Sequence, residues 1–144
     1  MKNNGFIGIL GLLFILSMII LRGCSSRADD PNVAFARTAF KSLSVGDTRV
    51  EGAIDWPSFQ CSGMDAGAQY NSLPNETEKA GFRSAFISSF SSSFQASGAD
   101  ADNFTNWRVQ GSDTVAADTP SNTTLSVTIS QQGEQRKISR LEIG

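Results

Sequence analysis

The sequence predicts an α+β domain in which helices come first and an antiparallel sheet follows. Three observations predict this class: a helix start at Asp30, a phenylalanine at every fourth position after Pro74, and alternating apolar residues from Trp107 onward. Residues four apart share one face of a helix, whereas strict alternation is typical of a strand with one buried side. The predicted order is therefore helices and then strands.

The first helix is predicted over residues 31–45. The Asp30 side chain can cap a helix N-terminus, and Pro31 fits the first turn, where no amide hydrogen bond is lost. Gly46 follows as a C-terminal cap. Between them, apolar residues recur at helical spacing, namely Val33, Ala36, Phe40 and Leu43.

A second, weaker helix is predicted over residues 48–55, where Val50 and Ile54 share a face. It should stop at Trp56, because the residue before Pro57 is pushed out of the α region. Residues 57–73 are rich in glycine, serine and other small residues. They form either a long loop or a short edge strand, and the pattern favours neither.

The longest helix is predicted over about 20 residues from Pro74. Glu76 and Glu78 lie in its first turn, where the helix dipole favours carboxylates. Its apolar stripe consists of Phe82, Phe86, Phe90 and Phe94, and the opposite face is mostly serine. Because the polar face lacks the lysine and arginine of a membrane-surface helix, we expect the stripe to pack on the sheet.

The rest of the domain is predicted to be an antiparallel meander. Trp107 and Val109 alternate in one strand, and Leu125, Val127 and Ile129 alternate in another. After the turn at residues 131–134, the apolar positions change parity between residues 138 and 141. Such a change predicts a β-bulge in the last strand.

The composition excludes several kinds of site. The chain contains no histidine and two cysteines, Cys24 and Cys61. Serine–histidine and cysteine–histidine catalysis and histidine or thiolate zinc sites are therefore excluded, and we expect no metal and no cofactor. The chain beyond residue 23 is slightly acidic, which argues against a nucleic-acid partner, because binding to a phosphate backbone needs a basic face.

The N-terminus resembles a bacterial lipoprotein signal. Lys2 precedes an uncharged apolar segment, residues 6–21, and the following Leu21-Arg22-Gly23-Cys24 matches the lipoprotein box at Leu21, Gly23 and Cys24. The resemblance implies a signal peptide over residues 1–23, an acylated Cys24 that holds the protein to the membrane, a tether over residues 24–29 and a domain over residues 30–144. Arg22 departs from the box, and the alternative is an uncleaved signal anchor. Either reading places the domain in the cell envelope, on the non-cytoplasmic side of the membrane.

The order of elements from Asp30 to Gly144 resembles the NTF2-like (cystatin-like) cone. The resemblance depends on that order, on the helix ending at residues 44–47 and on the closing strands. It implies a curved sheet that wraps a long helix and can enclose a pocket. The family contains enzymes, binding modules and accessory domains, so membership does not set the function.

Four residues are candidates for a pocket or a recognition surface: Asp55, Trp56, Tyr70 and Trp107. An aspartate base with a tyrosine donor in an apolar pocket is one way in which cone-fold isomerases work. The structural alternative is that Asp55 ends a helix and Trp56 fills the core. Tryptophans such as Trp56 and Trp107 are also favoured at recognition surfaces.

Two further groups have a functional and a structural interpretation. The Cys61 thiol is either reactive or buried and inert. Basic side chains on neighbouring strands form either a basic patch or solvated strand faces of mixed charge. These are Arg108, Arg136, Lys137 and Arg140.

The main hypothesis is therefore a non-enzymatic envelope lipoprotein whose domain binds a protein or a small apolar ligand. The alternatives are a cone-fold enzyme acting on an apolar substrate through Asp55 and Tyr70, and a structural envelope component. An enclosed pocket with Asp55 pointing into it would favour the enzyme. A filled core with an exposed apolar groove would favour the binding domain.

Overall fold

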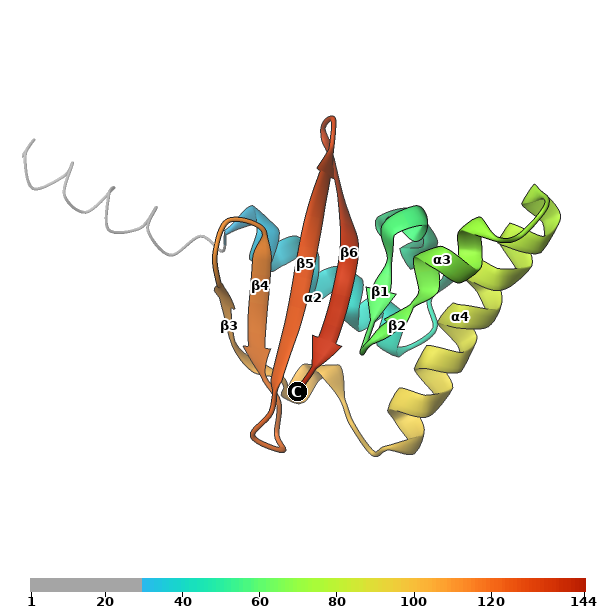
Figure 1. Cartoon of the computed structure of the whole chain (residues 1–144). Helices are drawn as coiled ribbons and strands as arrows, with labels where there is room; N and C mark the ends of the chain where they lie inside the picture. The colour runs from blue at the N-terminus through green and yellow to red at the C-terminus, as the bar shows by residue number, and fades with distance from the viewer. Residues whose placement is uncertain (1–29) are drawn as a thin grey trace, which may run out of the picture.

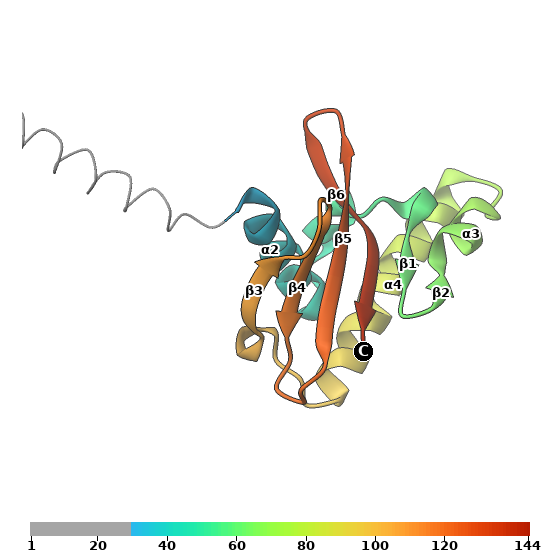
Figure 2. The same cartoon turned by 60° about the vertical axis from the view of Figure 1, so that its left-hand side comes forward.

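A computed structural model of the chain describes residues 30–144. The predicted signal peptide, Cys24 and the tether lie outside these residues. The described part confirms the α+β class: a mixed six-stranded sheet carries helices on one face, and the other face is left uncovered (Figures 1 and 2).

Two long helices precede a four-stranded meander, as the sequence predicts, and a short hairpin of two strands lies between the helices. The helical elements are α2 (Pro31–Ser44), η1 (Thr48–Ala53), η2 (Trp56–Ser58), α3 (Ala66–Asn71), α4 (Glu76–Ala96) and η3 (Ala101–Asn103). The strands are β1 (Gln60–Cys61), β2 (Met64–Asp65), β3 (Thr105–Val109), β4 (Thr114–Asp118), β5 (Thr124–Gln132) and β6 (Gln135–Ile143). Their order in the sheet is β2-β1-β6-β5-β4-β3.

Local side-chain caps start the two long helices. The Asp30 carboxylate accepts a hydrogen bond from the amide of Asn32 (2.8 Å), with Pro31 in the first turn. The Asn75 side chain accepts from the amide of Glu78 (2.9 Å), which begins α4. At the other end of α2, Gly46 takes φ +74°, the left-handed conformation of a glycine C-cap.

The last four strands form the predicted antiparallel meander. β3 pairs with β4, β4 with β5 and β5 with β6, all antiparallel. The predicted bulge is confirmed: Thr128 pairs with Arg140 and Ile129 with Ile138, so Ser139 is the additional residue. The bulge allows both Ile138 and Leu141 to be fully buried on the same side.

The sheet is not purely antiparallel, which corrects the prediction. β1 pairs in parallel with β6, through Gln60 with Arg140 and Cys61 with Leu141, and β2 folds back on β1 as the edge strand. Residues 57–73 are thus neither one loop nor one strand. They contain η2, the β1–β2 hairpin and α3. The predicted helix over residues 48–55 is the shorter 3₁₀ helix η1.

The prediction that the phenylalanine helix packs on the sheet is wrong. α2 lies across the sheet and contacts β3, β4, β5 and β6, whereas α4 packs mainly against α2 and η1 (Figure 1). The buried residues of α2 are Val33, Ala36, Ala39, Phe40, Leu43 and Ser44. α4 therefore occupies the side of α2, next to the β1–β2 hairpin.

The phenylalanine stripe is half-buried rather than central. On α4 the buried residues are Ile87 and Ser91, and the four phenylalanines lie along one flank of that face. Ser91 is buried, although it belongs to the serine face that was predicted to lie opposite the stripe. Its hydroxyl donates to the Ser44 carbonyl (3.1 Å), close to Gly46, and so joins α4 to the end of α2.

Candidate functional site

Asp55 lies between η1 and η2, against the last strand. Its backbone amide donates to the Ile138 carbonyl (2.9 Å), and its carboxylate accepts from the Ser130 hydroxyl (3.2 Å). The residue is 9% exposed. These two hydrogen bonds join the segment before η2 to the β5–β6 hairpin.

Trp56 is a core residue. It is 5% exposed, and its indole Nε1 donates to the Glu51 carbonyl (3.0 Å). The rings of Phe59 and Phe86 meet it edge-on, with centroids 5.8 and 5.7 Å away. Such contacts are the preferred packing of aromatic rings, so Trp56 contributes to stability more directly than to recognition.

Tyr70 lies on α3 and stacks on Trp56, with ring centroids 6.1 Å apart. Its hydroxyl accepts a hydrogen bond from Arg83 (3.0 Å). Arg83 also forms ion pairs with Glu76 (2.8 Å) and with Glu51. These carboxylates raise the pKa of the Arg83 guanidinium above its usual value, with the Glu76 contact the larger cause. Arg83 thus joins α3, α4 and η1, and the Tyr70 hydroxyl is part of that junction.

The structure brings Trp56 and Tyr70 together and places Trp107 elsewhere. Trp107 lies on β3, packs on Phe40 (6.4 Å between centroids) and donates from its indole nitrogen to the Phe104 carbonyl (3.2 Å). Asp55 bonds to Ser130 whereas Tyr70 bonds to Arg83, so the two have separate partners. Cys24, the candidate lipidation residue, lies outside the described residues.

Cys61 is buried, at 6% exposed. Burial raises the pKa of its thiol above the usual value, and a hydrogen bond from Ser62 opposes the rise. A thiol with a raised pKa forms little thiolate near neutral pH and is a poor nucleophile. The inert interpretation of Cys61 is the one that this environment favours.

The basic side chains on the strands do not form one patch. Arg108 pairs with Asp118 (2.9 Å), Arg136 donates to the Asn32 side chain (2.8 Å) and Arg140 to that of Gln60 (2.7 Å). Alternation along β6 also sends neighbouring side chains to opposite faces of the hairpin. Each of these arginines therefore has a local partner, as expected for strand faces of mixed charge.

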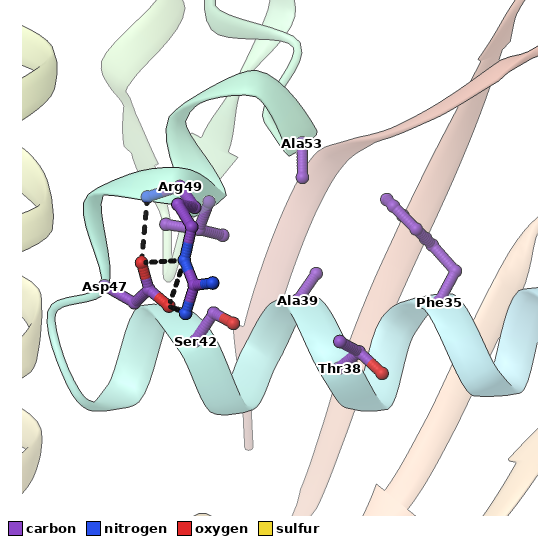
Figure 3. A pocket seen from close by; sticks show the side chains of 8 residues that line it. Phe35, Thr38, Ala39, Ser42, Asp47, Arg49 and Ala53 are labelled. Carbon is purple, nitrogen blue, oxygen red and sulfur yellow. Dashed lines mark hydrogen bonds and ion pairs between the residues drawn. The ribbon is translucent and has the colours of Figure 1, made fainter.

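A shallow hollow lies where η1 folds back over α2 (Figure 3). Its apolar lining comes from Phe35, Ala39, Val50 and Ala53. At one end, Arg49 forms a two-point ion pair with Asp47, with nitrogen–oxygen distances of 2.7 to 3.0 Å. Because Asp47 neutralises it, Arg49 offers little net charge to a ligand in this hollow.

Two neighbouring hollows follow α4 on its other flank, and we refer to them together as the α4 groove. Its upper part is lined by Cys61, Ser62, Met64, Phe86, Ser89, Phe90 and Ser93. Its lower part, of about 430 Å3, continues from Phe94 and Ser97 to Asp100, Phe104, the Thr119–Thr123 turn and Ile143. Phe90 and Phe94, one in each part, stack with centroids 6.1 Å apart, so the two parts are adjacent.

The α4 groove was not predicted, although the sequence contained a signal for it. From Ser84 to Ala99 no residue is charged, which is unusual for a helix with a solvent-exposed face. The phenylalanine stripe was assigned to the interior, but the structure leaves it half-exposed, with Met64 at 43% exposed opposite it. Only the position of the β1–β2 hairpin shows that these residues line a groove.

Within residues 30–144, no three acidic or cysteine side chains gather as a metal site would require. The same part of the chain has no helix long and apolar enough to cross a bilayer. No family model, no curated protein and no solved structure matches the chain.

Proposed function

We propose that this protein is a membrane-anchored lipoprotein of the cell envelope whose domain works by binding a partner. The observation that carries the proposal is the α4 groove, an exposed apolar surface alongside a filled core. Phe40, at the centre of that core, is fully buried. Apolar side chains that line an open groove make it a candidate interaction site.

The position of Asp55 supports the binding function over the enzymatic alternative. A cone-fold enzyme would direct Asp55 and Tyr70 into one apolar pocket. Here Asp55 is buried against Ser130, and Tyr70 is bonded to Arg83. Neither residue lines the α4 groove or the hollow beside α2. We also propose that the domain is an NTF2-like cone. The α+β class of the structure supports this proposal.

The binding function is tested with matched variants of the full chain in cells that express it. Ser89 lines the groove, whereas Ser88 is also exposed on the same helix and does not line it. We expect Ser89→Glu to abolish the in-cell phenotype of the protein, and Ser88→Glu and Asp55→Asn to preserve it. A folded Asp55→Asn variant that loses the phenotype, while Ser89→Glu retains it, would establish the enzymatic alternative instead.

The anchor is tested separately by intact mass. The membrane-extracted protein should lack residues 1–23 and carry added acyl mass on Cys24, and Cys24→Ser should remove both changes. An unprocessed N-terminus would replace the lipoprotein with the signal anchor and leave the binding function standing.

A further inference from the structure

We propose that the lower part of the α4 groove binds a primary ammonium group on a short aliphatic stem, as in a lysine side chain or a free alkylamine. The inference rests on the binding function above and names the chemistry of one group that the domain binds. Four features of the described residues carry it: an apolar floor, a lining with acidic but no basic side chains, the uncompensated end of α4, and a set of hydroxyl groups.

The floor of this hollow is apolar. Phe94 comes from the last turns of α4 and Phe104 from the segment before β3, and their ring centroids lie 6.0 Å apart. Pro120 and Ile143 add to the same lining. Phe94 is only partly buried, so part of its ring is open to a ligand. An aliphatic stem laid on this floor would bury apolar surface, which favours binding.

The lining carries negative charge without positive charge. Asp100 is the one charged residue among those that line the hollow. One of its carboxylate oxygens accepts from the Asp102 amide (2.9 Å), which leaves the other for a ligand. A neighbouring hollow shares Ile143 and adds a second carboxylate, that of Glu142. Within residues 30–144, neither Asp100 nor Glu142 forms an ion pair.

The basic side chains of the neighbouring elements are already neutralised. Lys41 on α2 pairs with Asp102 on η3 (2.6 Å). Arg108 on β3 pairs with Asp118 (2.9 Å), the residue before the turn that borders the hollow. A cation that enters the hollow therefore meets an excess of negative charge, and an anion is repelled.

The end of α4 adds to this negative potential. The C-terminal end of a helix carries about half a negative charge, and a lysine or arginine in the last turn commonly compensates it. α4 has no basic residue in its last turn. Ser97 and Gly98, which end the helix, both line the hollow. A ligand cation placed there would take the position that a basic side chain usually fills.

The hydroxyl groups favour a primary ammonium over a quaternary one. The Thr119 hydroxyl is buried and lies 3.0 Å from that of Ser121 and 2.6 Å from that of Thr123, and all three residues line the hollow. Each hydroxyl oxygen has two lone pairs, so it can accept a further hydrogen bond. A primary ammonium has three donors for these oxygens and for Asp100, whereas a quaternary ammonium has none.

The test is saturation-transfer difference NMR on the full chain in maltoside micelles, in an amine-free phosphate buffer. The probes share a four-carbon stem: butylammonium, butyltrimethylammonium, butanol and butyrate. Empty micelles give the background. We expect butylammonium to bind about fivefold more tightly than butanol and butyltrimethylammonium, and butyrate to bind most weakly. Added salt should reduce the preference for the cation.

Matched variants locate the site. Asp100→Asn, which can still cap η3, should remove the preference of butylammonium over butanol and leave butanol binding unchanged. Ser121→Lys, on the exposed turn, should weaken butylammonium by placing a cation at the hollow. Glu134→Gln makes the same charge change as Asp100→Asn at the tip of the β5–β6 hairpin, at the opposite end of β6 from Ile143 (Figure 1). It should leave all the probes unaffected.

The source of the ammonium group is identified with the peptide acetyl-Gly-Lys-Gly-amide. Tighter binding than butylammonium, lost in Asp100→Asn, would support the site and assign it to a lysine of a partner protein. Weaker binding would support the site and assign it to a free amine.

Equal binding of butylammonium, butanol and butyrate, no binding by any probe, or equal losses in Asp100→Asn and Glu134→Gln would overturn the inference. The proposed function fails separately, if Ser89→Glu in the upper part of the groove preserves the in-cell phenotype.

Discussion

Phe40 connects the helices to the sheet, and removing its ring tests the packing that the structure describes. It is fully buried on α2. On α4, the rings of Phe94 and Phe90 have centroids 5.5 Å and 6.3 Å from that of Phe40. The ring of Phe104, just before β3, is 5.2 Å away, and that of Trp107, on β3, is 6.4 Å away. The substitution Phe40→Ala therefore leaves a cavity that three elements border.

The expected loss follows from this burial. A fully buried phenylalanine changed to alanine costs about 3–5 kcal/mol, and a side chain that several separate elements surround belongs in the upper half of that range. Phe40→Leu keeps most of the volume but loses the edge-on ring contacts, so it should cost about 1–1.5 kcal/mol. With an m-value of about 2 kcal/mol/M, Phe40→Ala should lower the urea midpoint by about 2 M.

The assay is urea unfolding of a fragment spanning residues 27–144, monitored through the fluorescence of its two tryptophans. Trp107 contacts Phe40 directly and should report the change. Ser88→Ala, on the exposed side of α4, should stay within about 0.5 kcal/mol of wild type. A fall in midpoint below about 0.5 M for Phe40→Ala would show that α2, α4 and β3 do not meet at this ring.

Four other substitutions and conditions test separate contacts by the same unfolding assay. Phe86→Ala should cost about 2 kcal/mol, less than Phe40→Ala, because its ring is only partly buried; an equal loss would contradict the half-exposed stripe. Gly46→Ala should cost about 1–2 kcal/mol, because φ is +74° and the added Cβ would lie 3.1 Å from the Ser91 hydroxyl; a neutral result would contradict that backbone conformation. Arg83→Met should destabilise by about 1–2 kcal/mol, since two glutamates lose their partner, and added salt should narrow the gap to wild type. Burial raises the pKa of the Cys61 thiol, so the unfolded chain loses that proton first, and stability should fall as pH rises above about 8.5; Cys61→Ala should lack this part of the alkaline decline.

Local signals account for the parts of the fold that were predicted correctly. Asp30 and Pro31 started α2, Gly46 ended it, and the parity change near Ser139 marked the bulge. Each of these signals acts within one turn of helix or between adjacent strands, so the residues that determine it are neighbours in the sequence.

The β1–β2 hairpin and the mixed sheet were not predicted, because each depends on distant partners. β1 is two residues long, and Gln60 and Cys61 become a strand through pairing with Arg140 and Leu141, far along the chain. A segment this short carries no periodicity of its own. The position of Asp55 could not be predicted for the same reason, because its hydrogen-bond partner Ser130 lies 75 residues farther along the sequence.

The sequence by itself determined the two long helices, the four-stranded meander after them and the absence of histidine chemistry, because these depend on composition and on local spacing. The tertiary structure decided which helix covers the sheet. α2 contacts β3, β4, β5 and β6, whereas α4 packs mainly against α2 and η1. α4 is therefore left at the side, where Phe86, Phe90 and Phe94 are half-buried and line a groove. A stripe of phenylalanines predicts burial, but only the packing of the other elements sets how much of it stays exposed.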